Sequence, residues 1–184
     1  MNLKSLNISP NWTLFLDRDG VINHRLTGDY VKSWDELRFL DGVLDAIRVF
    51  SETFGNIVIV TNQQGIGKGL MAEETLLEIH RKMVKEISEA GGRIDKVYFC
   101  PDLKSAGSFY RKPQVGMGIQ AKKDYPNIKF KNSIMAGDTE SDMKFGKRLK
   151  MKTVLINDDF AVARANPALV DFRFNSLIDF ANSL

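Results

Sequence analysis

The sequence of 184 residues has little cysteine and no long apolar run. Its single cysteine, Cys100, excludes an internal disulfide and a zinc site built from several cysteines. The longest uninterrupted aliphatic stretch, residues 57–60, is far shorter than the roughly 20 residues of a membrane-spanning helix. Residues 1–5 lack the apolar core of a signal peptide. We therefore expect a protein with no membrane partner, located in the cytoplasm.

An excess of positive charge is also missing. No run of five or more Lys or Arg residues occurs, and the formal net charge is only +3. The sequence therefore has no polybasic tail for nucleic acid. Hydrophobic residues make up 43% and charged residues 27% of the chain, which is typical of a folded globular protein. The length suits one domain over residues 1–184, which we expect to be a monomer.

Short apolar runs alternate with helical patterns along the chain. Residues 72–90 form the clearest helical pattern, and Ser176 is a plausible N-cap for a helix over residues 177–184. The alternation predicts an α/β fold with three layers, in which helices cover both faces of a central, mainly parallel sheet. The strand-like runs are residues 13–16, 57–60, 97–100, 133–136 and 153–156, and further helices are expected at residues 44–50 and after Pro113 and Asp138.

Polar residues capable of chemistry follow four of these runs. Because the carboxyl ends of parallel strands meet at one edge of a sheet, we expect these side chains to share a site there. Taken singly, each group has a simpler interpretation as a helix cap or a solvated loop. The residues are Asp17 and Asp19 after the first run, Thr61 and Asn62 after the second, Arg111 and Lys112 after the third, and Asp138 and Asp142 after the fourth.

This set of residues suits phosphoryl transfer. Asp17 can be the nucleophile that forms an aspartyl-phosphate. Asp19 can protonate the leaving oxygen and later deprotonate water, provided that its neighbours raise its pKa above the usual ~3.9. Thr61 and the backbone amides that follow it can donate hydrogen bonds to phosphoryl oxygens.

The charges of such a site require cations. Ionised Asp17 and Asp138 with a phosphate dianion make about −4, whereas Mg²⁺ with Lys112 returns about +3. The planar guanidinium of Arg111 can close this gap and suits a second anionic group on the substrate. Asp138 should bind the metal directly, and Asp142, one helical turn later, could orient the metal's waters or brace Lys112.

Two other patterns do not support a function. Residues 65–69 look like a phosphate loop, but Asn62 and Gly69 stand where a Walker A sequence needs Gly and Ser or Thr. His24 and His80 have no partner at the spacing of metal ligands, and we expect His80 to pack on the inner face of its helix.

The motifs Asp17-x-Asp19-Gly20, Thr61-Asn62, Lys112 and Gly137-Asp138-x-x-x-Asp142 resemble the four motifs of the haloacid dehalogenase superfamily. The resemblance implies a Rossmann-like fold and dependence on Mg²⁺. It also implies that Asp17 is the nucleophile and Asp19 the acid/base. The implied metal ligands are Asp17, the Asp19 carbonyl and Asp138. The intervals between motifs leave no room for a cap domain, so we expect the loops of residues 20–41 and 101–110 to shield the site.

Longer stretches are similar to one branch of that superfamily, the D,D-heptose 1,7-bisphosphate phosphatases and the related histidinol-phosphate phosphatases. These stretches are residues 15–23, 29–31, 60–66 and 111–117. The resemblance implies a small phosphorylated substrate, with release of the 7-phosphate of a heptose bisphosphate as the first expectation and histidinol phosphate as an alternative. Asn23, Asn62 and Arg111 are the expected substrate contacts.

Two departures from that branch stand out. Most of its members carry a zinc loop, but here only Cys100 is kept, and Asp102, Ser108 and Tyr110 occupy the other three ligand positions. We therefore expect no zinc. Thr139 stands where the heptose enzymes usually have Lys.

A second resemblance leads to another substrate. Residues 61–69 and 109–113 are also similar to the polynucleotide 3′-phosphatases, which lack zinc. Nucleic acid processing therefore remains an alternative, although the sequence has no basic stripe for a nucleic acid backbone.

Overall fold

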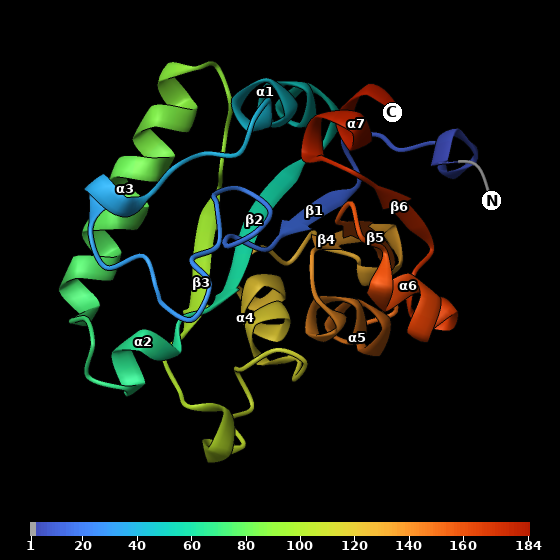
Figure 1. Cartoon of the computed structure of the whole chain (residues 1–184). Helices are drawn as coiled ribbons and strands as arrows, with labels where there is room; N and C mark the ends of the chain where they lie inside the picture. The colour runs from blue at the N-terminus through green and yellow to red at the C-terminus, as the bar shows by residue number, and fades with distance from the viewer. Residues whose placement is uncertain (1–2) are drawn as a thin grey trace.

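The computed structural model describes residues 3–184, and its centre is a six-stranded sheet in the order β3-β2-β1-β4-β5-β6 (Figure 1). Every pairing between neighbouring strands is parallel, which confirms the predicted sheet. Five strands coincide with the predicted runs to within two residues. The strands are β1 (Thr13–Leu16), β2 (Asn56–Asn62), β3 (Lys96–Cys100), β4 (Ser133–Gly137), β5 (Lys152–Ile156) and β6 (Phe172–Phe174).

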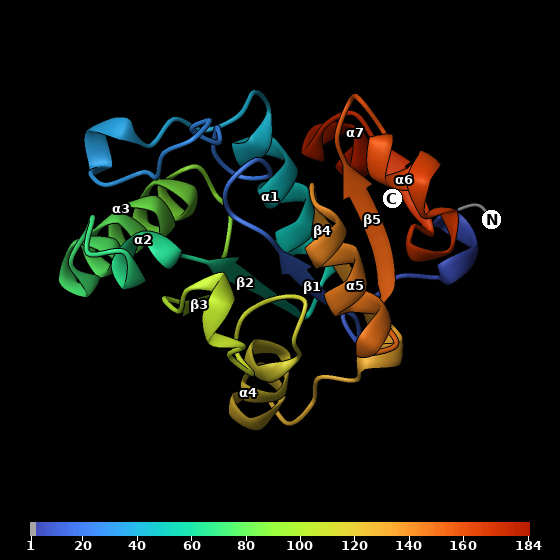
Figure 2. The same ribbon diagram turned by 60° about the horizontal axis from the view of Figure 1, so that its bottom comes forward.

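Alternation of side chains along β1 builds a core on each face of the sheet. Leu14 and Leu16 point into the larger core, and Phe15 points into the other. Helices α1, α3 and α7 cover the first face, and α4 and α5 cover the second, so the fold has the three predicted layers (Figure 2). The helices are α1 (Val43–Thr53), α2 (Gln64–Gly67), α3 (Glu73–Glu89), α4 (Gly116–Asp124), α5 (Glu140–Arg148), α6 (Ala161–Ala165) and α7 (Leu177–Asn182).

The ends of the helices follow local sequence signals. The predicted helix at residues 72–90 is α3, which differs by one residue at each end. The Ser176 side chain accepts a hydrogen bond from the Asp179 backbone N–H, which confirms the predicted N-cap of α7. Strand β6 and helices α2 and α6 were not predicted, since each is too short for a hydrophobic period to stand out.

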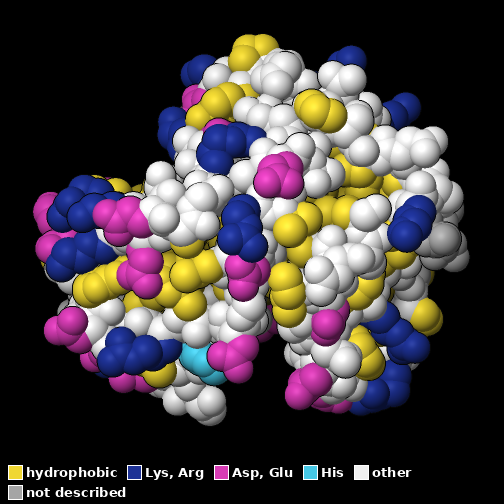
Figure 3. Space-filling model, turned by 90° about the horizontal axis from the view of Figure 1, so that it is seen from above, with side chains coloured by type: hydrophobic (Ala, Val, Ile, Leu, Met, Phe, Trp, Pro, Cys, Tyr) yellow, Lys and Arg dark blue, Asp and Glu magenta, His cyan; other side chains and the backbone are white. Residues whose placement is uncertain are grey.

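Two long segments pass over the carboxyl edge of the sheet. The segment between β1 and α1 and the segment between β3 and α4 contain only the short 3-10 helices Trp34–Glu36 and Lys104–Ala106. On the face drawn in Figure 3, Lys and Arg side chains alternate with Asp and Glu and form no continuous basic stripe. Within residues 3–184, no helix combines the length and the apolar character needed to cross a membrane.

Replacing Phe180 by Ala should lower the free energy of unfolding by about 3–5 kcal/mol, because a buried ring is lost and a cavity remains. The Phe180 ring is fully buried, 5.1 Å from the Phe50 ring and 5.5 Å from the Phe174 ring between centroids. Urea unfolding of the purified variant measures this loss. The control Ile119→Ala, at a half-exposed position, should change the free energy by less than about 0.5 kcal/mol. Equal losses in the two variants would contradict a core role for α7.

Candidate active site

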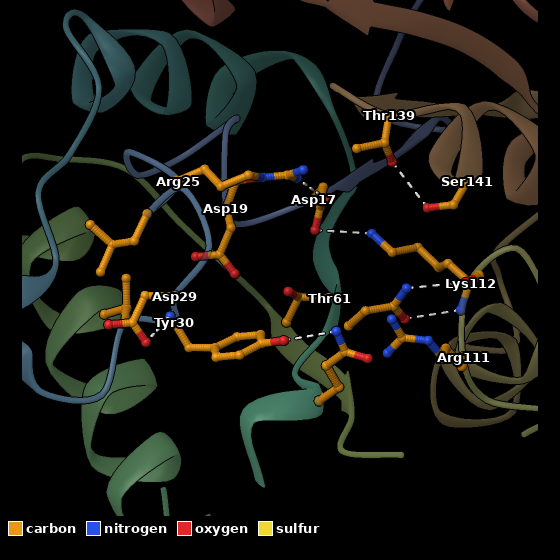
Figure 4. Close-up of a pocket in the computed structure, with 14 residues that line it drawn as sticks. Asp17, Asp19, Arg25, Asp29, Tyr30, Thr61, Arg111, Lys112, Thr139 and Ser141 are labelled. Atoms are coloured by element: carbon orange, nitrogen blue, oxygen red, sulfur yellow. Dashed lines mark hydrogen bonds and ion pairs between the residues drawn. The ribbon is translucent and has the colours of Figure 1, made fainter. Parts of the chain in front are cut away.

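A cavity of about 240 Å³ opens at the carboxyl ends of the central strands. Asp17 directly follows β1, Thr61 and Asn62 end β2, and Arg111 and Lys112 enter from the segment after β3. Figure 4 shows the Lys112 side chain reaching toward Asp17, with Thr61 and Arg111 around the same cavity. The predicted residues that line the cavity are Asp17, Asp19, Thr61, Asn62, Arg111 and Lys112.

Two glycines allow close approaches around the end of β4, one from the loop after β1 and one from the first turn of α5. Gly20 has a φ of +89°, and a Cβ atom there would collide with the Asp138 carboxyl group. A Cβ atom at Gly137 would collide with the Asp142 side chain. The two glycines therefore allow these acidic residues to gather. Oxygens of Asp17, Asp138 and Asp142 lie within 4.8 Å of one another, which is close enough to hold a metal ion.

The Lys112 ammonium group is buried among these carboxylates. Its Nζ lies 2.6 Å from Asp142 Oδ1 and 2.9 Å from Asp17 Oδ1. Burial alone would lower the pKa of Lys112, but the charges of Asp142 and Asp17 raise it, so the group stays protonated. The other oxygen of Asp142 accepts a hydrogen bond of 3.0 Å from the Thr139 backbone N–H at the start of α5. Asp142 therefore ties Lys112 to the first turn of that helix.

Crowding of negative charge disfavours ionisation of two carboxyl groups. Burial, and then repulsion from Asp142, raise the pKa of Asp17 to about 6, although Lys112 opposes this. Burial, and then repulsion from Asp17 and Asp142, raise the pKa of Asp138 to about 8. A divalent cation would relieve this repulsion, so the site has the electrostatic character of a metal site.

Asp19 has the opposite environment. Burial by itself would raise the pKa of Asp19, but the charge of Arg18 and hydrogen bonds from Asn23, Arg18 and Gln63 hold it below the usual value. Asn23 Nδ2 donates to Oδ1 at 3.0 Å, and Gln63 Nε2 donates to Oδ2 at 2.8 Å. The expectation that the neighbours of Asp19 raise its pKa is therefore wrong for the substrate-free protein, because the adjacent guanidinium group stabilises the carboxylate.

Arg25 is a residue of the site that sequence reasoning missed. Its Nη2 lies 2.8 Å from the Asp19 carbonyl oxygen, 2.9 Å from Asp138 Oδ1 and 3.9 Å from Asp17 Oδ2. One cationic atom thus contacts all three groups that the family resemblance implies as metal ligands. No spacing rule connects Arg25 with Asp138, 113 positions later, so the sequence carried no signal for this contact.

Asn62 and Thr61 are held by neighbouring side chains. Asn62 Nδ2 donates to the Lys112 carbonyl oxygen at 3.1 Å, and its Oδ1 accepts from the Lys112 backbone N–H at 3.0 Å. The Thr61 hydroxyl accepts a hydrogen bond of 2.9 Å from Gln63 Nε2, which leaves its own hydrogen available to a ligand in the cavity.

The other two expected substrate contacts differ in accessibility. Arg111 lines the cavity while its Nη1 donates to the Asp102 carbonyl oxygen at 3.1 Å. Asn23 is fully buried behind Asp19, and its Nδ2 donates to Asp19 and to the His24 carbonyl oxygen. Its placement does not fit the expected contact with substrate. The physical reason is that its amide is used to orient the Asp19 carboxyl group.

The segment around Cys100 is held by weak hydrogen bonds. The Cys100 thiol donates to Asp102 Oδ2 at 3.5 Å and lies 3.8 Å from Ser108 Oγ. Burial raises the pKa of this thiol. Tyr110 is about half exposed.

Comparisons with known proteins extend over nearly the whole chain. Residues 13–169 match the family described as polynucleotide kinase 3 phosphatase. The chain is 34% identical over 170 residues to a D-glycero-alpha-D-manno-heptose-1,7-bisphosphate 7-phosphatase of Mycobacterium bovis, covering 92% of this chain and 90% of that protein. It is 34% identical over 181 residues to a D-glycero-beta-D-manno-heptose-1,7-bisphosphate 7-phosphatase of Haemophilus influenzae, covering 95% and 97%.

A solved structure is also similar to this chain over nearly its whole length. The crystal structure of D,D-heptose 1,7-bisphosphate phosphatase from B. bronchiseptica, complexed with magnesium and phosphate, superposes with a TM-score of 0.80 at 29% identity. The superposition covers 93% of this chain and 96% of that chain.

Because burial raises the pKa of the Asp138 carboxyl group, we expect the metal-free protein to lose stability as the pH rises from about 6.5 to 8.5. In this window Asp138 is protonated in the folded state until the pH passes about 8, but ionised in the unfolded chain, where its pKa is 3.8. Unfolding then releases a proton, so the free energy of unfolding falls as the pH rises. The slope for one proton is about 1.4 kcal/mol per pH unit, and we expect a fall of roughly 1–2 kcal/mol. Urea unfolding with a chelator present measures it.

The control for this prediction is Asp138→Asn, which has no proton to release and should flatten the profile. His80 opposes this trend weakly at the lower end of the window, because burial and then the charge of Arg18 lower its pKa to about 3, whereas the unfolded histidine, with a pKa of 6.5, is half protonated at pH 6.5. Above about pH 7.5 the unfolded histidine is largely neutral, so the slope there reports Asp138. Stability that rises with pH in the wild type, or an unchanged slope in the variant, would refute the assignment.

Proposed function

This chain belongs to the polynucleotide kinase 3 phosphatase family within the haloacid dehalogenase superfamily. On that premise we propose that it is a Mg²⁺-dependent phosphatase that releases the 7-phosphate of D-glycero-D-manno-heptose 1,7-bisphosphate. One observation carries the catalytic part of the proposal. The Asp17 carboxylate lines the cavity 2.9 Å from the buried Lys112 ammonium, and a second carboxyl group, Asp19, lines the same cavity. A nucleophile fixed beside a cation, with a second carboxyl group to carry the proton, is what an aspartyl-phosphate mechanism requires.

In the first step, an Asp17 carboxylate oxygen forms a bond to phosphorus while the ester P–O bond breaks. The leaving oxygen takes the proton of Asp19. In the second step, Asp19 removes a proton from water, the water oxygen attacks phosphorus, and the Asp17–phosphorus bond breaks to release phosphate. Lys112 stabilises the negative charge of the phosphoryl oxygens throughout, because it is fixed beside Asp17 before substrate arrives.

The protonation of Asp19 depends on the substrate. In the substrate-free protein the Arg18 guanidinium keeps Asp19 ionised, which is the form needed to accept a proton from water. A phosphate dianion bound beside Asp19 repels its charge and raises its pKa, so the proton for the leaving oxygen is taken up when substrate binds.

The acidic residues fit the magnesium ion that the family implies. Asp17, Asp138 and the Asp19 carbonyl oxygen would hold it, since these hard oxygen ligands already converge on the single cationic Nη2 of Arg25. When bound, Mg²⁺ supplies positive charge that neutralises the phosphoryl oxygens. The relative from B. bronchiseptica, described with magnesium and phosphate, supports this choice. Zinc is not part of the proposal.

A sugar bisphosphate suits the mouth of the cavity. Arg111 and Tyr30 line it beside Asn62, and they offer a planar guanidinium and an aromatic face to the part of the substrate that does not react. The named relatives that act on the two anomers of this bisphosphate are both 34% identical to the chain. Histidinol phosphate and a 3′-phosphorylated polynucleotide are the competing substrates, the latter favoured by the description of the matching family.

Specificity constants measured side by side on both heptose 1,7-bisphosphate anomers, histidinol phosphate and a 3′-phosphorylated oligonucleotide should be highest for one heptose anomer. Asp17→Asn should lower hydrolysis of every substrate by about 10³-fold or more, because the nucleophile is lost. Phosphate release in the presence of Mg²⁺ is the measurement.

Asp45→Asn is the matched control, since it removes an exposed carboxylate of α1 and should keep wild-type activity. A highest constant on the oligonucleotide, with binding that weakens steeply as salt increases, would replace the sugar by nucleic acid as substrate. Wild-type rates in Asp17→Asn would refute the phosphatase mechanism itself.

Calorimetric titration with MgCl₂ tests the metal ligands without measuring turnover. Asp138→Asn should weaken binding by about tenfold or more, because a direct ligand is lost. Arg25→Ala should strengthen binding by about fivefold, because a half-exposed guanidinium that competes for the same oxygens, in an ion pair worth ~1 kcal/mol, is removed. Asp45→Asn again serves as the control. Weaker binding in Arg25→Ala would contradict the shared cation position.

A further inference from the structure

Arg18 is a fully buried cation that is not among the residues lining the cavity. It lies between the two catalytic carboxylates in sequence, and its side chain is 1% exposed. Nη2 donates to Asp19 Oδ1 at 2.8 Å and to Oδ2 at 3.0 Å, and Nε donates to Oδ1 at 3.2 Å. The guanidinium plane therefore sets the plane of the Asp19 carboxyl group.

The remaining nitrogen of this guanidinium points to helix α3. Arg18 Nη1 lies 3.0 Å from Nε2 of His80, which is buried in α3 beside the Phe99 ring. A guanidinium can only donate hydrogen bonds, so Nε2 must be the acceptor. His80 is therefore neutral, with its proton on Nδ1. Its pKa, lowered to about 3 by burial and then by the charge of Arg18, agrees with this assignment.

We propose that His80 is a positioning residue, whose neutral imidazole, acting through Arg18, holds the Asp19 carboxyl group in the orientation that transfers a proton to the leaving oxygen. This inference rests on the proposed function, in which Asp19 is the acid/base. His80 lies outside the residues that line the cavity, so it does not touch the substrate. The contact couples a helix of the outer layer to the reacting group at the edge of the sheet.

The chain of contacts has few ways to rearrange. Asn23 and Gln63 donate to the two Asp19 oxygens from other directions, so a rotation of Arg18 would compete with both hydrogen bonds. Without an acceptor at residue 80, the buried Nη1 must find another partner, and the guanidinium must turn to reach it. The Asp19 carboxyl turns with it. A displacement of about 1 Å in a catalytic group can reduce the rate as much as 10²-fold.

The dependence of rate on the leaving group distinguishes positioning of Asp19 from a structural role. An aryl ester such as p-nitrophenyl phosphate releases a stable anion and needs little help from an acid, whereas an alkyl phosphate such as glycerol 2-phosphate needs the proton. In His80→Leu, we expect kcat on the alkyl ester to fall about tenfold more than kcat on the aryl ester. His80→Gln, which keeps an acceptor oxygen, should restore the wild-type ratio.

Three further variants set the scale of the effect and control for lost stability. Asp19→Asn should show the full loss, with the alkyl rate falling about 10²-fold or more relative to the aryl rate. Adding His80→Leu to Asp19→Asn should leave that ratio unchanged, because no acid remains to be oriented. Met83→Ala, a buried change on the same helix, controls for lost stability and should lower both rates equally. Thermal unfolding confirms that each variant is folded at the assay temperature.

The possible outcomes distinguish a failure of the positioning role of His80 from a failure of the proposed phosphatase mechanism. Equal losses on both esters in His80→Leu, with a changed ratio in Asp19→Asn, would overturn the role of His80 alone. A wild-type ratio in Asp19→Asn would overturn the acid role of Asp19 in the proposed function. A changed ratio in Met83→Ala would show that any loosening of α3 has this effect, and it would also overturn the specific role of His80.

Discussion

The site depends on how three crowded carboxyl groups are balanced by one buried ammonium group. Lys112 contacts Asp17 and Asp142, while Asp138 lies close enough to share a cation with them. Removing charges from water is costly unless opposite charges replace the lost hydration, so this arrangement requires well-fixed partners. The sheet fixes Asp17 and Asp138 after adjacent parallel strands, and the first turn of α5 fixes Asp142. Much of the local architecture therefore serves to hold Lys112.

The two carboxyl groups at the end of β1 show how neighbours divide the chemistry. Asp17 faces other carboxylates, which disfavour its charge, whereas Asp19 faces the Arg18 guanidinium, which favours it. Only one residue separates them, so the contrast comes from the different neighbours that surround each side chain. Asp17 contacts Lys112 beside the other acidic residues. Asp19 instead accepts hydrogen bonds from Arg18, Asn23 and Gln63. In the proposed mechanism, the same strand end would supply both the nucleophile and the proton carrier.

The sheet and the acidic residues could be predicted because their signals are local. Apolar runs mark the strands, and charged residues mark where the runs end. Arg25 and the partnership of Arg18 with His80 could not be predicted, since they join residues 113 and 62 positions apart. Asn23 shows a related limit. A motif indicated that it belongs to the site, but only the packing shows that its amide faces a carboxyl group and not the cavity.

The paired hydrogen bonds between the Asn62 side chain and the Lys112 backbone have a consequence for the loop that precedes Lys112. The Asn62 amide both donates a hydrogen bond to the Lys112 backbone and accepts one from it. Asn62 is the last residue of strand β2, so the backbone of Lys112 is held to the sheet. The loop of residues 101–111 can therefore change in length, composition or metal content while the Lys112 ammonium group stays in place. Recognition of new substrates can thus diversify in the loop without disturbing the chemistry that it delivers.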